Sequence, residues 1–361
     1  MNLFYAFVFF IVAVLLLLAA VTRVGVWQIE RSYPPVGSFK TVNKTKLHYV
    51  HIKASENADL PPIVFLHGAS GNLLDQMAVY GEKLKSRADL IFIDRPGHGY
   101  SSRGLKSNAM PDGQAATIAA LLDELGIDKA IIAGHSFGGV VTVSFALNHP
   151  NKTIGTVFMS PVSHAWPGGV TWYYNLTSIP IIGRVFSETL ALPAGLTRLV
   201  SGTACVFAPN EPTADYGKKT AVPLVLRPYH FRNNAVDVAG LYDYVVKTSP
   251  RYREIKTPSI IITGDKDTVV LPDVHSRGLN RDIENSELYF IQNMGHKPDH
   301  LAADMVVAAL ENIAGAKNDL ALLRDQVQLR IAKDAFGPIE KCLDPDSVIG
   351  KSVLGQKEQA N

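Results

Sequence analysis

The sequence predicts an α/β protein built on a doubly wound, mostly parallel sheet, with an inserted helical segment and one N-terminal membrane-spanning helix. Two observations predict this class. Short apolar runs alternate with helical patterns between residues 46 and 316, and an uncharged apolar run lies near the N-terminus. The 361 residues, 47% of them hydrophobic and 19% charged, can bury a large core, so disorder over most of the chain is not expected.

Residues 3–21 form the apolar run, LFYAFVFFIVAVLLLLAAV. As a helix it would measure about 28 Å, close to the hydrocarbon thickness of a bilayer. A cleaved signal peptide is the alternative, but it requires a positive charge before a shorter apolar core, and no Lys or Arg precedes this run. We therefore expect an uncleaved, single-pass anchor over residues 1–22 and a juxtamembrane linker over 23–45. Arg23, Arg31 and three lysines follow the run and favour a cytoplasmic catalytic domain.

Apolar runs after the linker predict the strands of the sheet. Continuous runs suit strands that are buried on both faces of a parallel sheet. The expected strands are 46–53, 63–66, 90–93, 130–133, 156–159, 259–263 and 288–291. Helical periodicity predicts helices over 114–125, 137–148 and 301–313, so strands and helices alternate.

Residues 162–250 interrupt this alternation, because they are rich in aromatic residues and proline and contain no clear strand run. We expect a cap inserted between two parts of the core, 46–161 and 251–316, and movable or partly movable over the site. Packing of the aromatic side chains onto the sheet is the alternative. Residues 317–361 form a more polar extension, in which 321–335 fits an amphipathic helix.

The strongest chemical signal is Gly134-His135-Ser136-Phe137-Gly138-Gly139, between an expected strand and an expected helix. A serine in a G-x-S-x-G turn at this place is typical of a nucleophile elbow, which projects the hydroxyl above the sheet. The following helix N-terminus offers N–H groups to a developing anion. We interpret Ser136 as a nucleophile. An incidental serine in a glycine-rich turn is the alternative.

A serine hydroxyl needs a base to accept its proton, and the base needs a carboxylate to orient it. The segment Thr263-Gly264-Asp265-Lys266-Asp267 follows one expected strand, and Asn293-Met294-Gly295-His296 follows the next. Both segments therefore lie at carboxyl ends of strands, where doubly wound sheets place their sites. The order serine, acid, histidine is the one that this chemistry has on such a sheet.

Residues 47–313 resemble the α/β-hydrolase superfamily, in particular its capped esterases, C–C bond hydrolases and epoxide-hydrolase-like members. The matching segments are His67-Gly68, Asp94-Arg95-Pro96-Gly97-His98-Gly99-Tyr100-Ser101, the elbow, Gly264-Asp265-Lys266-Asp267 and Gly295-His296. The resemblance implies Asp267 rather than Asp265 as the acid and His296 as the base.

The same resemblance implies an oxyanion hole made by the backbone N–H groups of Ala69 and Phe137. A turn that merely ends a strand is the alternative reading of His67-Gly68. We expect His135 to pack beneath the site and His300 to be an ordinary packing or surface residue. The loop from Asp94 to Ser101 is expected to be structural.

The family uses aspartate as nucleophile in haloalkane dehalogenases and epoxide hydrolases, so Ser136 favours acyl transfer. We expect hydrolysis of a carboxylic ester or related acyl bond in a fairly apolar, small-molecule or lipid-like substrate. A C–C bond hydrolase acting on a diketone uses the same three residues and stays open. A non-catalytic binding protein of this fold is the alternative from another class.

The sequence shows no metal cluster, phosphate loop or dinucleotide fingerprint, so no cofactor is expected. A net charge of +2 without a long basic tract gives no support for a nucleic-acid partner. The two cysteines, Cys205 and Cys342, have no metal-ligand spacing. We expect two unpaired thiols, with a Cys205–Cys342 disulfide as the alternative.

Overall fold

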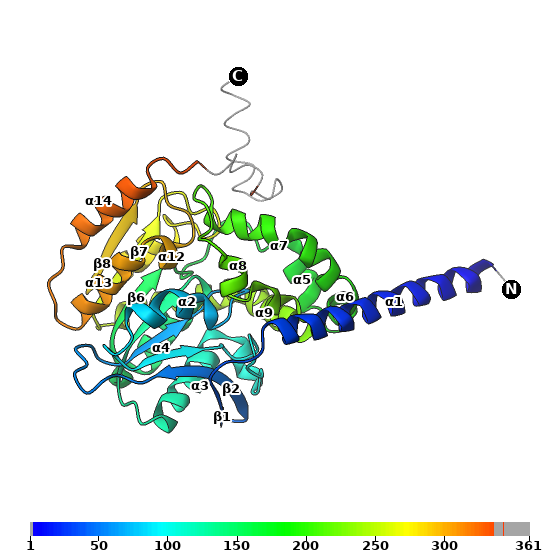
Figure 1. Ribbon diagram of the computed structural model, residues 1–361, viewed down its shortest axis with the longest axis horizontal. Helices are drawn as coiled ribbons and strands as arrows, with labels where there is room; N and C mark the ends of the chain where they lie inside the picture. Colours follow the sequence, from blue (N-terminus) through cyan, green and yellow to red (C-terminus); the bar gives the residue numbers. More distant parts are fainter. Residues whose placement is uncertain (1–2, 336–341, 343–361) are drawn as a thin grey trace, which may run out of the picture.

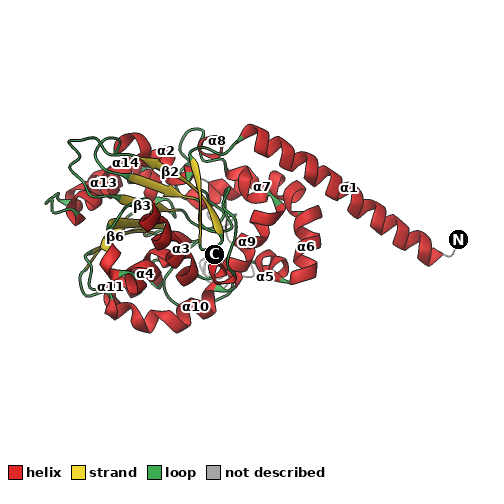
Figure 2. Cartoon of the chain, turned by 90° about the horizontal axis from the view of Figure 1, so that it is seen from below, coloured by secondary structure: helices red, strands yellow, loops and turns green. Residues whose placement is uncertain are grey.

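The computed structural model describes residues 3–335 and residue 342 of the chain. One sheet is covered by helices on both faces (Figures 1 and 2). Its strands are β1 (Ser38–Val42), β2 (Thr45–Ile52), β3 (Ile63–Leu66), β4 (Leu90–Ile93), β5 (Ala130–His135), β6 (Thr153–Met159), β7 (Ser259–Gly264) and β8 (Ser286–Ile291). Their order across the sheet is β1-β2-β4-β3-β5-β6-β7-β8. The β1–β2 and β2–β4 pairs are antiparallel and the other pairs are parallel.

The helices outside the insertion are α1 (Leu3–Ser32), α2 (Leu74–Lys83), α3 (Pro111–Glu124), α4 (Phe137–Asn148), α11 (His275–Asp282), α12 (Pro298–Leu301), α13 (Ala303–Ile313) and α14 (Leu320–Ile331). Alternate residues of β3 show how they cover the sheet. Ile63 and Phe65 pack in a cluster with residues of α2, α13 and α14, whereas Val64 and Leu66 pack with residues of α3 and α4. A continuous apolar run is therefore buried on both faces, which confirms the predicted doubly wound, mostly parallel sheet.

The insertion between β6 and β7 is helical. It contains α5 (Trp172–Ser178), α6 (Pro180–Thr189), α7 (Ala191–Phe207), α8 (Tyr216–Lys219), α9 (Pro228–Ala239) and α10 (Leu241–Thr248). The cap lies at the carboxyl ends of the strands, because the backbone N–H of His296, just after β8, donates to the Val206 carbonyl of α7 at 3.3 Å.

A buried ion cluster fastens α9 of the cap to the core. The Asp237 carboxylate lies 2.6 Å from the Arg103 guanidinium, 2.9 Å from His98 Nε2 and 3.6 Å from the Arg95 guanidinium. Breaking such a buried cluster leaves uncompensated charges, so α9 is held firmly against the core. Movement of the cap stays a prediction.

The predicted linker over 23–45 differs from the structure. Helix α1 continues without a break to Ser32, and Ser38–Val42 forms the edge strand β1. The last turns of α1 are ordered by the cap, because Ile29 is buried among Leu192, Leu224 and Leu226. Local sequence does not reveal this contact, since it joins residues that lie far apart in the chain.

The expectation of two unpaired thiols was wrong, because Cys205 and Cys342 form a disulfide. They lie 137 residues apart in the sequence, and the fold brings their Cα atoms to 5.1 Å. The bond joins α7 of the cap to the C-terminal extension. Within that extension, α14 contributes Leu320, Val327 and Ile331 to the main hydrophobic cluster, so this helix packs on the core. The remaining residues lie outside the described ones.

Candidate active site

Ser136 lies in the tight turn between β5 and α4. Its backbone has φ 54° and ψ −118°. Residues other than glycine rarely adopt such a positive φ. The turn requires glycine nearby, because a Cβ on Gly138 would lie 2.1 Å from the Leu66 carbonyl oxygen. The hydroxyl group therefore lies at the carboxyl end of the sheet, and the residue is only 7% exposed.

His296 and Asp267 form a hydrogen-bonded pair. His296 Nδ1 lies 2.7 Å from Asp267 Oδ2, and both side chains are buried. The other carboxylate oxygen, Oδ1, accepts from the backbone N–H groups of Val269 and Val270 at 2.9 and 2.8 Å. These two bonds fix the carboxylate, which in turn orients the imidazole ring and leaves its Nε2 as the acceptor. Asp265 has an exposed side chain and does not join the pair.

The structure brings this pair close to the elbow. The ring of His135, the residue before Ser136, has its centroid 4.8 Å from that of His296, and its Nε2 lies 2.8 Å from the His296 carbonyl oxygen. Among the described residues, no hydrogen bond yet joins Ser136 Oγ to His296. Such contacts are often long without substrate and tighten when it binds.

The Ala69 and Phe137 N–H groups stand beside the elbow without an acceptor among the residues that the structure describes. The next N–H group along the loop, that of Ser70, does have an acceptor, because it donates to Asn234 Oδ1 at 2.7 Å. A Cβ built on Gly68 would lie 3.0 Å from the Ser136 Cβ, so the loop that carries Ala69 lies against the serine. Two free donors next to a serine hydroxyl fit the requirement for stabilising an oxyanion.

Arg95, which the sequence interpretation left without a role in the site, holds both parts of this arrangement. Its guanidinium donates to the carbonyls of His67 and Gly68 at 2.9 and 3.0 Å and lies 4.5 Å from the centroid of the Phe137 ring. The side chain is fully buried, and burial lowers its pKa to about 10, which still leaves it charged at neutral pH. The signal was its position two residues after the end of β4, but the local sequence does not show where the side chain reaches.

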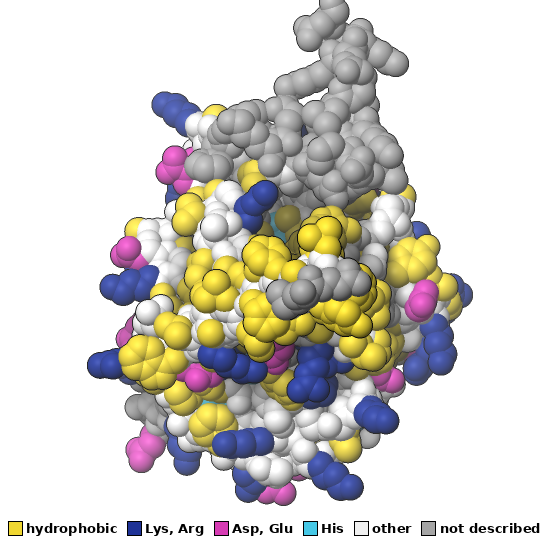
Figure 3. All heavy atoms as spheres, turned by 90° about the vertical axis from the view of Figure 1, so that its right-hand side faces the viewer, with side chains coloured by type: hydrophobic (Ala, Val, Ile, Leu, Met, Phe, Trp, Pro, Cys, Tyr) yellow, Lys and Arg dark blue, Asp and Glu magenta, His cyan; other side chains and the backbone are white. Residues whose placement is uncertain are grey.

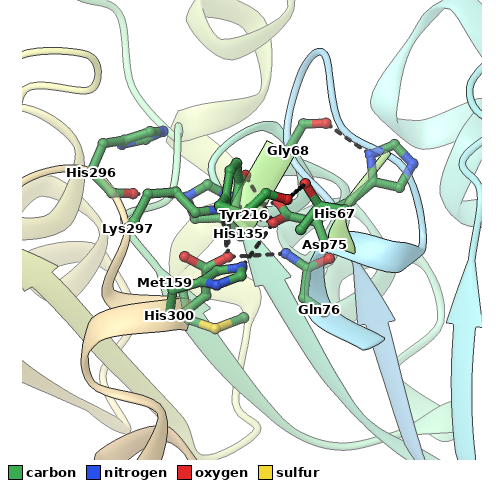
Figure 4. A network of polar contacts seen from close by, with 12 residues as sticks. His67, Gly68, Asp75, Gln76, His135, Met159, Tyr216, His296, Lys297 and His300 are labelled. Carbon is green, nitrogen blue, oxygen red and sulfur yellow. Dashed lines mark hydrogen bonds and ion pairs between the residues drawn. The ribbon is translucent and has the colours of Figure 1, made fainter. Parts of the chain in front are cut away.

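A buried polar cluster adjoins His296 and contains the next residue in the chain, Lys297. Figure 4 shows Lys297 extending into it while the His296 ring lies outside. The Lys297 ammonium lies 2.9 Å from Asp75 Oδ2 and 2.9 Å from Asp299 Oδ2. His300 Nε2 lies 2.9 Å from Asp75 Oδ1, so His300 is a packing residue with a charged partner rather than a surface residue.

The charges of this cluster support one another. Burial alone would raise the pKa of Asp75, but the Lys297 charge and the hydrogen bond from His300 hold it well below its usual range. Burial likewise opposes the charged form of Lys297, but Asp299 and Asp75 raise its pKa well above the usual value. Burial lowers the pKa of His135 to about 4, so this buried histidine is neutral at pH 7.

Asp75, Asp299 and His300 also place three possible metal-ligand atoms within 4.8 Å of one another. The Lys297 ammonium, however, lies between the two carboxylates and already supplies the positive charge that they require. The set therefore fits an internal ammonium group better than a metal ion. A surface hollow of about 530 Å³ adjoins the cluster at Tyr216 and His300, but its lining includes neither Ser136 nor His296.

We predict that Lys297→Met destabilises the fold by about 3–5 kcal/mol, because it leaves two buried carboxylates without a counter-charge. Chemical denaturation in detergent measures the effect. Lys266→Met is the matched control, since its side chain is exposed in the preceding loop and its loss should change stability by at most about 0.5 kcal/mol. Equal stability of the two variants would contradict a stabilising role for the cluster.

The pH dependence of this stability follows from the same shifts. Asp75 and Asp299 have lowered pKa values, so their contribution is present above the unfolded value near 4 and is lost as the pH falls through the folded values. We expect the stability difference between wild type and Lys297→Met to shrink in acid, when the carboxylates become protonated. A difference that stays constant through acid unfolding would contradict this assignment.

Comparisons with known proteins agree with this fold. The family model described as alpha/beta hydrolase fold matches residues 61–298. A 2-hydroxy-6-oxononadienedioate/2-hydroxy-6-oxononatrienedioate hydrolase from Comamonas testosteroni is 24% identical over 271 residues, which cover 74% of this chain and 92% of that protein.

Two solved structures share the fold at low identity. A bacterial membrane phospholipase A has a TM-score of 0.61 and 18% identity, with 88% of this chain and 100% of that chain covered. The enol-lactonase from Burkholderia xenovorans LB400 has a TM-score of 0.58 and 20% identity, with 77% and 100% covered.

Proposed function

The chain belongs to the alpha/beta hydrolase family, and on this basis we propose that it is a serine hydrolase that cleaves carboxylic esters of apolar, lipid-like substrates. The observation that carries the proposal is the buried His296–Asp267 pair, at 2.7 Å, beside a serine held at φ 54° in the elbow. A binding protein would not need a strained serine, an oriented histidine and two free N–H donors in one place.

The residues would act in a fixed order. Ser136 Oγ attacks the acyl carbon while His296 Nε2 takes the hydroxyl proton, and Asp267 stabilises the imidazolium that forms. The Ala69 and Phe137 N–H groups receive the oxyanion. Collapse of the tetrahedral intermediate expels the alcohol, which takes the proton from His296. Water then hydrolyses the acyl-enzyme by the same steps, which returns the serine.

Cleavage of a C–C bond is the second candidate. The name of the Comamonas testosteroni relative supports it, since that protein acts on a 2-hydroxy-6-oxo dienedioate. We favour the ester because α1 is apolar enough to cross a membrane, and an anchored site would lie where amphiphilic esters gather. A dienedioate carries two carboxylates and is water-soluble.

The two candidates differ in a direct assay. Full-length protein in detergent should hydrolyse p-nitrophenyl esters with a kcat/KM that rises with acyl chain length. The same preparation should act on 2-hydroxy-6-oxononadienedioate at a much lower kcat/KM. The reverse ranking would assign the chain to C–C bond hydrolysis.

We propose that α1 remains in the mature protein as its membrane anchor. The apolar run and the cap contact belong to one unbroken helix, and the Thr22 hydroxyl donates to the Thr189 carbonyl at 3.2 Å. Membranes washed in high salt should retain the protein, detergent should release it, and sequencing should find residues 3–21. A soluble protein that begins after Val21 would contradict the anchor.

The side of the membrane is a separate question. The Arg and Lys residues after the run predict a cytoplasmic domain. The Cys205–Cys342 disulfide favours an oxidising compartment, because disulfides are rare in the cytosol. We give the disulfide more weight, since the charge rule rests on few residues around one span. We therefore propose that the domain lies on the oxidising side of the membrane. Protease added to intact cells or spheroplasts should then digest it. A domain that resists protease until the membrane is permeabilised would restore the cytoplasmic placement.

A further inference from the structure

One end of the cap carries an apolar face that no described residue covers. It lies on α6 and α7, two apolar helices that meet at 69°. Ile181 is 79% exposed and Val200 is 83% exposed, values unusual for side chains of this size in a soluble domain. We call this the cap apolar face, and its residues are Ile179, Ile181, Ile182, Val185, Leu196 and Val200.

The cap apolar face belongs to the two helices, α6 and α7, that pack against α1. Figure 3, which looks onto this end of the molecule with α1 projecting toward the viewer, shows hydrophobic side chains gathered here and bordered below by Lys and Arg. The helix is fixed against the cap by close contacts. Arg23 pairs with Glu188 at 2.5 Å, and a Cβ on Gly25 would lie 2.6 Å from Leu192 Cδ2. The direction of α1 therefore fixes the orientation of α6 and α7.

The cap contact begins where the membrane-spanning run ends. Residues 3–21 fill about 28 Å of hydrocarbon as a helix, and the next residue, Thr22, is already buried against the cap. No spacer separates the bilayer from the domain. Trp27 lies further along the same helix, 58% exposed, and Arg31 stands 5.4 Å from its ring centroid, a pairing that suits the headgroup region.

Helix α7 connects this face to the proposed site. It begins at Ala191 beside α1, exposes Leu196 and Val200 along its length, and ends at Phe207. The Val206 carbonyl near its end accepts the His296 N–H. Helix α7 therefore runs from the cap apolar face to the segment that carries the proposed base.

We propose that the cap apolar face is embedded in the headgroup and acyl boundary of the membrane that α1 spans, and that it admits acyl substrates directly from the bilayer. This inference rests on the proposed anchor and names the source of the substrate. A lipid surface is the occupant because the face is continuous with the span itself, and its basic border fits anionic headgroups.

The test measures lipid contact without using catalysis. Val200→Cys and Leu329→Cys are each labelled with the fluorophore NBD in full-length protein, in which the native cysteines are paired and do not react. Leu329 is the matched control, since it is 79% exposed on α14, at the end of the molecule far from α1 (Figure 1). Both proteins are reconstituted in phosphatidylcholine vesicles with and without a doxyl-labelled phosphatidylcholine.

Emission from position 200 should shift to the blue and be quenched by the doxyl lipid, whereas emission from position 329 should do neither. Equal behaviour of the two positions would overturn the proposal. A blue shift at position 200 without doxyl quenching would also overturn it, because the face would then be covered by protein, such as a second copy. Failure of the esterase assay would leave this readout intact, so the two proposals fail separately.

A second measurement links the face to substrate entry. Val200→Asp should lower kcat/KM for a long-chain ester dispersed in vesicles by about fivefold, the effect of placing a charge near the membrane interface. It should leave kcat/KM for a short, soluble ester unchanged, and Leu329→Asp should change neither. Equal loss on both esters would show that position 200 supports the fold rather than entry, which contradicts the proposed role.

Discussion

Replacement of Ser136 by alanine should lower turnover of any ester substrate by about 10⁴-fold or more, as removal of the nucleophile does in related chemistry. Alanine lacks the Oγ that attacks the acyl carbon, and water must then act without a covalent intermediate. The measurement is kcat for a p-nitrophenyl ester in detergent. The fold should persist, because alanine accepts the turn about as well as serine does.

Ser160→Ala is the matched control. Ser160 also follows a strand, is buried, and has a positive φ of 44°, but its hydroxyl faces Thr263 at 3.5 Å. This variant should keep its activity within a few-fold. Loss of activity in Ser160→Ala with retention in Ser136→Ala would move the nucleophile away from the elbow.

Asp267→Asn should lower kcat by about 10³–10⁴-fold while changing the site little in shape. Asparagine can accept hydrogen bonds from Val269 and Val270, but its amide cannot stabilise the imidazolium, and its NH₂ group favours the wrong tautomer of His296. Asp265→Asn is the control, two residues away and exposed, and should stay near wild type. A larger loss in Asp265→Asn would make Asp265 the acid.

The central strands and the elbow could be predicted from sequence because their signals are local. The apolar runs 63–66 and 90–93 coincide with β3 and β4, and the predicted helix 137–148 coincides with α4. Each of these strands is buried on both faces, so its sequence is a continuous apolar run that can be recognised locally. The segments of Asp267 and His296 were predicted at strand ends, and β7 and β8 are neighbours in the sheet, whereas the choice of Asp267 over Asp265 came from the family resemblance.

The elements that were missed depend on distant partners. Strand β1 lies at the exposed edge of the sheet and, among the described strands, pairs only with β2. Most of its residues are exposed and few are apolar, so its sequence does not indicate a strand. The last turns of α1 contain Arg23, Glu30 and Arg31, and they remain helical because Arg23 and Glu30 pair with Glu188 and Arg227 of the cap. Tertiary contact overrides local pattern at both places.

The site residues that were missed are charged and buried. Arg95 and Lys297 are types that are almost never fully buried without partners, so composition alone places them on the surface. Their partners come from other parts of the chain, Asp237 for Arg95 and Asp75 for Lys297. The disulfide was missed for the same reason, since 137 residues separate its cysteines.

The most direct test of the account is a covalent label. Full-length protein treated with a fluorophosphonate probe should gain one adduct, and mass spectrometry of the digest should place it on Ser136, because only an activated serine attacks the phosphorus atom. Asp267→Asn should slow the labelling, and Ser136→Ala should abolish it. An unlabelled wild-type protein, or an adduct on another residue that survives Ser136→Ala, would contradict the proposal that Ser136 is an activated nucleophile.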